Sequence, residues 1–131
     1  MELKLLTPDR QVFSGEAELV GGRTEEGSFS LLPRHIPAVM ELEPSSLKVK
    51  GPEGVRRFVV HGGYLFKERD ETIRVLTREA KDFEDLSPSE LEDRVEELEG
   101  KLEEMEEGVR YEKTSLELER AKLSLDLIEH E

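Results

Sequence analysis

Apolar and polar positions alternate with a period of two through the first part of the chain. Glu2 to Leu6 alternates and is followed by Thr7-Pro8-Asp9-Arg10, which is typical of a turn. Further short apolar runs follow, separated by turn residues at about the 8-to-12-residue spacing of an antiparallel sandwich or barrel. Phe29 to Leu32 is such a run and ends at Pro33. The pattern therefore predicts an N-terminal antiparallel β domain.

Two β-hairpins are expected in the second half of this domain. The turn residues Gly51-Pro52-Glu53-Gly54 separate one pair of runs, and the segment from Glu68 to Glu71 separates the other. Gly62-Gly63 precedes a strand-like run and lacks a phosphate-loop pattern, so we expect a bulge or a close backbone approach there. The paired runs are residues 47–50 with 55–60 and residues 64–66 with 72–77.

The apolar pattern becomes helical after Glu84. Ser87-Pro88-Ser89-Glu90 is a capping box with proline in the first turn, and it predicts that a helix begins there. Gly108 is expected to end this helix, and a second helix is expected from about Tyr111 to Glu129. A single narrow apolar seam marks the first helix: Leu91, Val95, Leu98, Leu102, Met105 and Val109.

The second helix carries two apolar rows where the first helix carries one. One row can pair with the first helix, so we expect an antiparallel hairpin whose other row packs on the β domain or on a partner. The predicted organisation is α+β in two parts, a β domain at residues 1–84 and a helical hairpin at residues 85–131. The candidate packing or partner residues are Leu116, Leu118, Ala121, Leu123, Leu125 and Leu127.

Charge is distributed unevenly between these two parts. Residues 1–84 hold 13 basic and 15 acidic side chains, net −2, whereas residues 85–131 hold 6 basic and 17 acidic side chains, net −11. A total of −13 disfavours nucleic acid and anionic lipid surfaces, because both are bound by clustered lysine and arginine. No apolar run approaches the roughly 18 to 20 residues that span a bilayer. We therefore expect no nucleic-acid partner and no direct membrane insertion.

The sequence offers no constellation of residues for catalysis or for a metal. It has no cysteine, and its three histidines, His35, His61 and His130, lack metal-ligand spacing. Its serines follow no nucleophile-elbow pattern. The N-terminal residues lack the hydrophobic region of a secretory signal, so a cytoplasmic protein is the default. We expect no catalytic residue, no cofactor and no metal.

One segment of the β domain is the best partner-binding candidate. Glu26 to Pro37 combines a glycine turn, an apolar strand and two prolines that bracket Arg34 and His35. Proline restricts the backbone, so this segment can present a rigid rim at low entropic cost.

The chain resembles the epsilon subunit of F-type ATP synthases along nearly its whole length. Residues 3–8 and 12–15 are similar to that family's opening strand and turn. Residues 26–37 are similar to its most diagnostic stretch. Matches also occur in the later strands, at Gly62-Gly63-Tyr64-Leu65 and Val75-Leu76-Thr77, and in the second C-terminal helix, at Tyr111, Leu118, Glu119-Arg120-Ala121 and Leu125.

The resemblance implies a flattened β-sandwich of about ten short strands with a helical hairpin, in a non-catalytic subunit of the rotating central stalk. Such a subunit would help couple proton transport to ATP synthesis, as a peripheral component at the cytoplasmic face of the cell membrane. One edge of the sandwich would bind the gamma subunit and the other the polar loops of the c-ring. The implied contact candidates are Glu26, Gly27, Ser28, Phe29, Leu32, Arg34 and His35.

The sequence departs from the family in two places. Ser28 and Ser30 stand where the family often has an acidic residue and a glycine. Members that bind ATP carry an I/L-D-x-x-R-A motif at the start of the first helix, which here reads Leu86-Ser87-Pro88-Ser89-Glu90-Leu91. A carboxylate thus replaces the arginine that would pair with phosphate, and we expect no ATP binding.

Inhibition of ATP hydrolysis by the extended hairpin is the family's other regulatory mode, and it brings basic residues to an acidic segment of the beta subunit. The tail of this chain is strongly acidic, so we expect the hairpin to be mainly a docked structural element. Any inhibition would rely on apolar contacts with the alpha or beta subunits. The possible beta-subunit contacts are Lys113, Arg120 and Lys122.

Two other classes of function are weighed beside this one. A free-standing adaptor that binds a partner through the acidic hairpin is also compatible with the second row of leucines. An enzyme with an active site in the sandwich would require a pocket with perturbed titratable groups, for which the sequence has no constellation.

Overall fold

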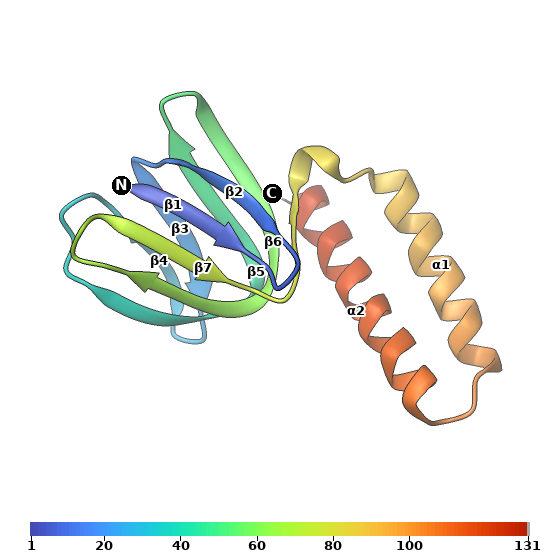
Figure 1. Ribbon diagram of the computed structural model, residues 1–131. Coiled ribbons are helices and arrows are strands. Elements are labelled where there is room, and N and C mark those ends of the chain that lie inside the picture. Colours follow the sequence, from blue (N-terminus) through green and yellow to red (C-terminus); the bar gives the residue numbers. More distant parts are fainter. Residues whose placement is uncertain (131) are drawn as a thin grey trace. The chain divides into compact units, whose positions relative to one another are not determined.

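The computed structural model describes residues 1–130. They belong to two compact units, Met1–Phe83 and Glu84–Glu131, the first built mainly from strands and the second mainly from helices (Figure 1). The strands among the described residues are β1 (Glu2–Leu6), β2 (Gln11–Glu16), β3 (Leu19–Thr24), β4 (Gly27–Leu31), β5 (Ala38–Gly51), β6 (Gly54–Lys67), β7 (Thr72–Leu76) and β8 (Ala80–Asp82).

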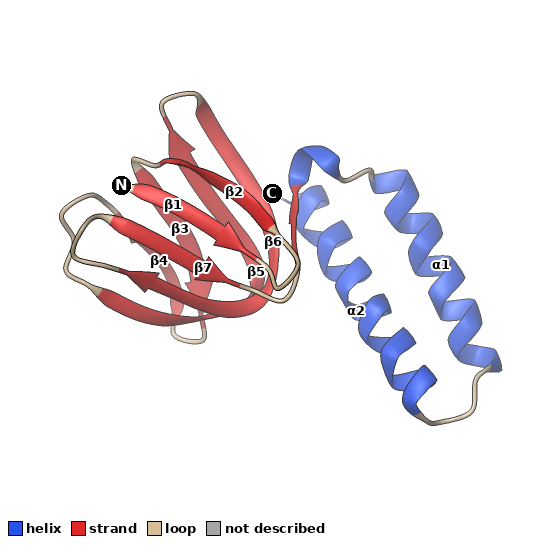
Figure 2. Cartoon of the chain, in the orientation of Figure 1, coloured by secondary structure: helices blue, strands red, loops and turns tan. Residues whose placement is uncertain are grey.

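The strands form two layers that share a pair of long strands, β5 and β6 (Figure 2). In one layer, the first half of β6 pairs with β8 on one side and with the second half of β5 on the other. The second half of β5 also pairs with β3, and β3 pairs with β4. In the other layer, the second half of β6 pairs with β7, β7 pairs in parallel with β1, and β1 pairs with β2. The predicted β-sandwich followed by two helices is confirmed.

The described sandwich has fewer and longer strands than the expected ten, namely eight. Residues 55–60 and 64–66 were expected as separate strands, but both belong to β6, which continues through Gly62 and Gly63. The pair Glu43–Gly62 is missing from the ladder here, beside Pro44, although β5 and β6 keep the same register on both sides of it, and both strands pass from one layer into the other. Glycine permits the bend because Gly62 and Gly63 have φ of +83° and +124°.

The bend also reverses which positions of β6 face the core. Phe58 and Val60 point inward in the first half, whereas Leu65 points inward in the second half. A constant period of two therefore breaks between them, and this is why the sequence pattern looks like two strands. The buried side chains of the core include Leu3, Leu5, Val20, Leu31, Leu42, Leu47, Val49, Phe58, Val60, Leu65, Ile73 and Val75.

The second unit begins with the helix that the capping box predicts. Helix α1 spans Pro88–Glu104. Ser87 is its N-cap, and the Ser87 side-chain oxygen accepts a hydrogen bond from the backbone N–H of Glu90 at 3.5 Å. The prediction of the helix start is confirmed.

The predicted end of this helix was wrong. Helix α1 ends at Glu104, and α2 spans Val109–His130, so Val109 belongs to the second helix instead of the first seam. Gly108 does not terminate α1; its carbonyl accepts a hydrogen bond from Glu112 N–H in the first turn of α2. Four glutamates between positions 103 and 107 place negative charge at the C-terminal end of α1, where the helix dipole disfavours it.

The hairpin is held together by a small core and by ion pairs. Leu98 of α1 is buried against Leu118 and Ala121 of α2, and the half-buried Val95 and Leu102 flank them. No helix within residues 1–130 is both long and apolar enough to cross a bilayer.

An ion pair at the surface of the hairpin links the two helices, and further ion pairs lie along α1. Arg94 contacts Glu117 at 3.0 Å across the helices and Glu97 at 3.4 Å along α1. Lys101 contacts Glu97 at 3.1 Å, and the two residues have the i, i+4 spacing that favours such pairs on a helix. The hydrogen bond from Lys101, with the charges of Lys101 and Arg94, holds the pKa of Glu97 below its usual value.

Candidate partner-binding surfaces

The segment from Leu32 to Pro37, called the rim loop below, joins the edge strand β4 to β5. Leu32 and Ile36 are exposed, although both are large apolar side chains. Pro33 and Pro37 stand near its two ends and restrict its backbone. The loop therefore presents apolar side chains to solvent from a stiff backbone, as a contact surface requires.

Hydrogen bonds fix the rim loop, both within itself and to a neighbouring turn. The N–H of Leu32 donates to Nδ1 of His35 at 3.0 Å, and the N–H of His35 donates to the carbonyl of Leu32 at 3.3 Å. The N–H of Arg34 donates to Oε1 of Glu71, in the turn between β6 and β7, at 3.0 Å. His35 is thus a structural acceptor in the loop, while the Arg34 side chain is exposed.

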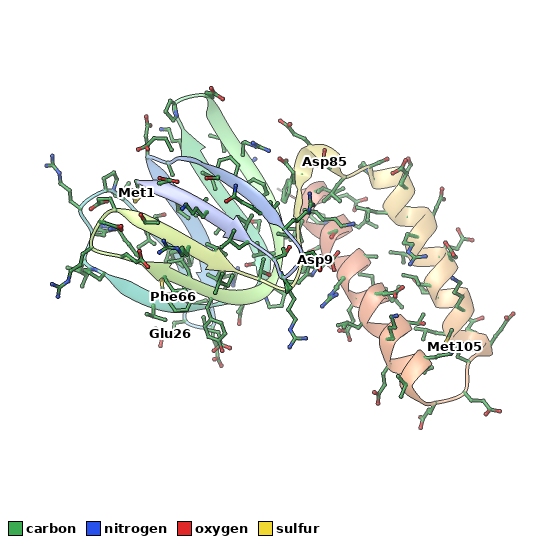
Figure 3. The ribbon with its side chains drawn as sticks, in the orientation of Figure 1. Met1, Asp9, Glu26, Phe66, Asp85 and Met105 are labelled. Atoms are coloured by element: carbon green, nitrogen blue, oxygen red, sulfur yellow. The ribbon has the colours of Figure 1, made fainter. Side chains whose placement is uncertain are left out.

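The remaining contact candidates lie in and after the turn between β3 and β4. Glu26 and Ser28 are exposed, and Gly27 occupies the turn with φ of +130° (Figure 3 labels Glu26). Phe29 differs from them, because its ring packs against the core and fills the space beside Gly22. The structure therefore presents Glu26 and Ser28 as surface groups and Phe29 mainly as a packing group.

A hollow of about 750 Å³ lies between this turn and the first half of β5. Glu25, Glu26, Glu41 and Glu43 line it together with a few apolar side chains, and its lining includes no lysine or arginine. Such a negative, open surface suits a basic or polar protein segment better than an anionic substrate. Among residues 1–130, no group of histidine, aspartate and glutamate side chains is arranged to hold a metal ion.

Sequence reasoning missed an apolar face on the outer surface of the layer that contains β7. It is formed by Val39, Tyr64, Phe66 and Leu76; Val39 lies opposite Phe66, and Tyr64 lies opposite Leu76. Val39 is 69% exposed and Tyr64 is 50% exposed. The rings of Tyr64 and Phe66 have centroids 6.5 Å apart, and Figure 3 labels Phe66 on β6.

The signal for this face was present in the sequence as three consecutive apolar residues, Tyr64, Leu65 and Phe66. A strand with one solvated face should alternate, so an unbroken apolar run means that both faces are covered or that one awaits a partner. Leu65 fills the core, and its two neighbours therefore belong to the outer surface.

The six candidate residues of α2 divide into two sets. Leu118 and Ala121 pack against Leu98 of α1, and Leu125 lines a shallow groove along α1. Of the other row, Leu116 is exposed, whereas Leu123 and Leu127 are half-buried. The row that faces α1 is thus Leu118, Ala121 and Leu125.

The basic residues of α2 are not gathered on one face. At about 100° per residue, Lys113 and Arg120 share a face, whereas Lys122 lies on roughly the opposite side of the helix from Lys113. Helix α2 begins at Val109, so Arg110 is a further basic residue of this helix, missed because the start was expected at Tyr111. Arg110 lies about 60° from Lys113 around the helix, so Lys122 is the lysine or arginine of α2 that lies away from the others.

Known proteins resemble this chain over the whole sandwich and beyond. A family described as ATP synthase, Delta/Epsilon chain, beta-sandwich domain matches residues 1–82. The ATP synthase epsilon chain of Thermotoga maritima is 35% identical over 99 residues, which cover 73% of this chain and 91% of that protein. The sodium ion specific ATP synthase epsilon chain of Propionigenium modestum is 33% identical over 85 residues, which cover 65% of this chain and 61% of that protein.

Two solved structures share the fold. A chain of the Euglena gracilis mitochondrial ATP synthase (OSCP/F1/c-ring) aligns with a TM-score of 0.66 at 24% identity, covering 97% of this chain and 76% of that chain. A chain of the Tetrahymena thermophila mitochondrial ATP synthase central stalk and c-ring aligns with a TM-score of 0.59 at 16% identity, covering 98% and 92%. At these identities the likeness concerns the fold.

Proposed function

Because the chain belongs to the epsilon-chain family of F-type ATP synthases, we propose that it is a non-catalytic subunit of the central rotor stalk. In this proposal it links the gamma subunit to the c-ring and helps couple proton transport to ATP synthesis. It is peripheral, at the cytoplasmic face of the cell membrane, and holds no cofactor. Two candidate contact surfaces on the sandwich support the proposal, namely the exposed apolar face and the rim loop with the β3–β4 turn. The exposed apolar face is the observation on which the proposal mainly rests.

The apolar face is proposed to bind the gamma subunit. A partner that stays bound through each rotation needs a stable interface, and stable interfaces centre on buried apolar and aromatic side chains. Tyr64 and Phe66 supply the aromatic groups, and Val39 and Leu76 supply aliphatic surface beside them. The register holds these side chains on adjacent paired strands, so little conformational entropy is lost on binding.

The rim loop and the β3–β4 turn are proposed to contact the polar loops of the c-ring. Leu32, Arg34 and Ile36 are exposed on the rim loop, and Glu26 and Ser28 are exposed on the turn. This mixture of charge and apolar groups is typical of the rim of an interface.

The gamma contact is tested by placing a charge in the apolar face. Val39→Asp and Tyr64→Asp should each weaken binding to an F1 complex that lacks its own epsilon by about tenfold or more, because an interface centre then buries an unpaired carboxylate. The matched control is Val55→Asp, since Val55 is 49% exposed but lies at the start of β6 in the other layer. Surface plasmon resonance at fixed salt measures the dissociation constants. Equal loss in all three variants, or no loss in either test variant, would contradict the proposal.

The hairpin is proposed to be mainly structural and to exert no electrostatic brake through the beta subunit. Lys113 and Arg120 share a face of α2, but Lys122 lies on roughly the opposite side and the unit as a whole is acidic. Glu90 stands where an ATP-binding member has arginine. Deleting residues 88–131 should therefore leave ATP hydrolysis by the assembled complex near its original rate. Titrating ATP into the intact chain should give no calorimetric isotherm. Several-fold activation after the deletion would overturn the proposal.

A further inference from the structure

We propose that Glu71 is a positioning residue, whose single carboxylate clamps the rim loop to the sandwich and at the same time neutralises the buried Lys67 ammonium. Glu71 lies in the turn between β6 and β7, far along the chain from the loop that it holds. Oε1 of Glu71 accepts the hydrogen bond from Arg34 N–H at 3.0 Å. Oε2 of the same carboxylate lies 3.5 Å from Nζ of Lys67.

The buried ammonium of Lys67 stabilises the position of the Glu71 carboxylate. The Lys67 side chain is 1% exposed, on the core-facing side of β6, and its Nζ has no hydrogen-bond partner among the described residues. Oε2 of Glu71 likewise has no other partner among them. A buried ammonium without a counter-charge is strongly destabilising, so Glu71 cannot swing into solvent without stranding Lys67.

The backbone at both ends of the clamp is held in a conformation that needs support. Arg34 has φ of +71° and Glu71 has φ of +67°, and these left-handed angles are uncommon for residues other than glycine. The carbonyl of Glu71 also accepts a hydrogen bond from Glu2 N–H of β1 at 2.9 Å, which ties the turn to the sheet. The Oε1 contact then transmits this fixed position to Arg34, midway along the rim loop.

The turn around Glu71 is itself ordered by its neighbours. Oδ1 of Asp70 accepts a hydrogen bond from Thr72 N–H at 3.1 Å, and the hydrogen bonds with Thr72 hold the pKa of Asp70 below its usual value. The clamp therefore acts from a rigid base. A loop ordered before binding loses less entropy on contact with a partner, and this consequence rests on the proposed function of the rim loop.

Four variants of the full chain separate the two tasks of the carboxylate. Glu71→Ala removes both the acceptor for Arg34 N–H and the negative charge beside Lys67. Glu71→Gln keeps an oxygen that can accept from Arg34 N–H but removes the charge. Lys67→Met removes only the ammonium, and the fourth variant combines Lys67→Met with Glu71→Gln. The readouts are the amide exchange rate of Arg34 by NMR and the melting temperature of the sandwich. The N–H of Glu2, which donates a hydrogen bond to the carbonyl of Glu71, is the internal reference for amide exchange.

We expect Arg34 exchange to rise about tenfold or more in Glu71→Ala while the Glu2 amide stays protected. Arg34 should stay protected in Glu71→Gln, whose melting temperature should nevertheless fall because Lys67 is left unpaired, and the double variant should recover that loss. Unchanged Arg34 exchange in Glu71→Ala would overturn the clamp. So would a rise that follows global stability equally at Arg34 and Glu2.

The affinity of the same variants for F1 and the c-ring tests a separate proposal, namely that the rim loop contacts the c-ring. Reduced affinity of Glu71→Ala together with fast Arg34 exchange supports both the clamp and the contact role of the rim loop. Fast exchange with unchanged affinity keeps the clamp and contradicts the proposed c-ring contact. Slow exchange contradicts the clamp whatever the affinity.

Discussion

Replacing Gly63 by alanine should destabilise the sandwich by roughly 4 kcal/mol or more, near the upper end for a single substitution. Gly63 has φ of +124°, a conformation that residues with a side chain rarely adopt. An added Cβ would also lie 2.0 Å from the carbonyl oxygen of Leu76, which belongs to the paired strand β7 and cannot move away without breaking the sheet. Both causes act at the bend where β6 passes between layers.

A matched glycine separates the two causes. Gly54 also has φ of +124°, but a Cβ there would meet nothing within 4 Å. Gly54→Ala should therefore cost only the backbone strain, about 1 to 3 kcal/mol. Urea titrations followed by the methyl NMR signals of Leu65 and Val75 report on the sandwich alone. Equal losses at Gly63 and Gly54 would show that the close approach to Leu76 does not matter.

Replacing Leu98 by alanine should destabilise the hairpin by about 3 to 5 kcal/mol. Leu98 is 1% exposed and is the centre of a small buried cluster with Leu118 and Ala121. Helices of this length are marginal without tertiary packing, and Gly100 lowers the propensity of α1 further. The loss should therefore appear as unfolding of both helices while the sandwich remains folded.

Leu116→Ala is the control for this substitution, because it makes the same chemical change at a position that is 45% exposed. It should cost about 1 kcal/mol or less. Amide exchange across α1 and α2 measures both variants. Protection of the α2 amides in Leu98→Ala equal to that in the unaltered chain would contradict the assignment of Leu98 as the centre of the hairpin.

Local signals were sufficient for the start of the first helix and for the change from strands to helices along the chain. The Ser87 cap acts within four residues, and the change of period after Glu84 reflects which faces are buried, so both are visible in the sequence. The end of α1 was not visible, because the sequence offered Gly108 as a terminator. The helix instead ends at Glu104 among crowded glutamates.

The candidate surfaces, too, were recognised from the sequence only where they depend on residues close together in the chain. The rim loop was recognised from its prolines, whose effect on the backbone is local. The apolar face was missed because the outward direction of Tyr64 and Phe66 depends on the reversal at Gly62-Gly63, which the alternation alone does not reveal. Phe29 was named as a contact candidate from the family resemblance, and its ring packs beside Gly22, a residue on the neighbouring strand.

The sequence by itself determined the two-part organisation, the concentration of acidic charge in the hairpin, the start of α1 and the resemblance to a family. Each depends on residue types or on spacings of a few positions. Only the tertiary structure decided how β5 and β6 cross between layers, which side chains remain on the outer sheet, and that Glu71 holds Arg34. These depend on register between strands and on contacts across 37 positions of the chain, which no local period encodes.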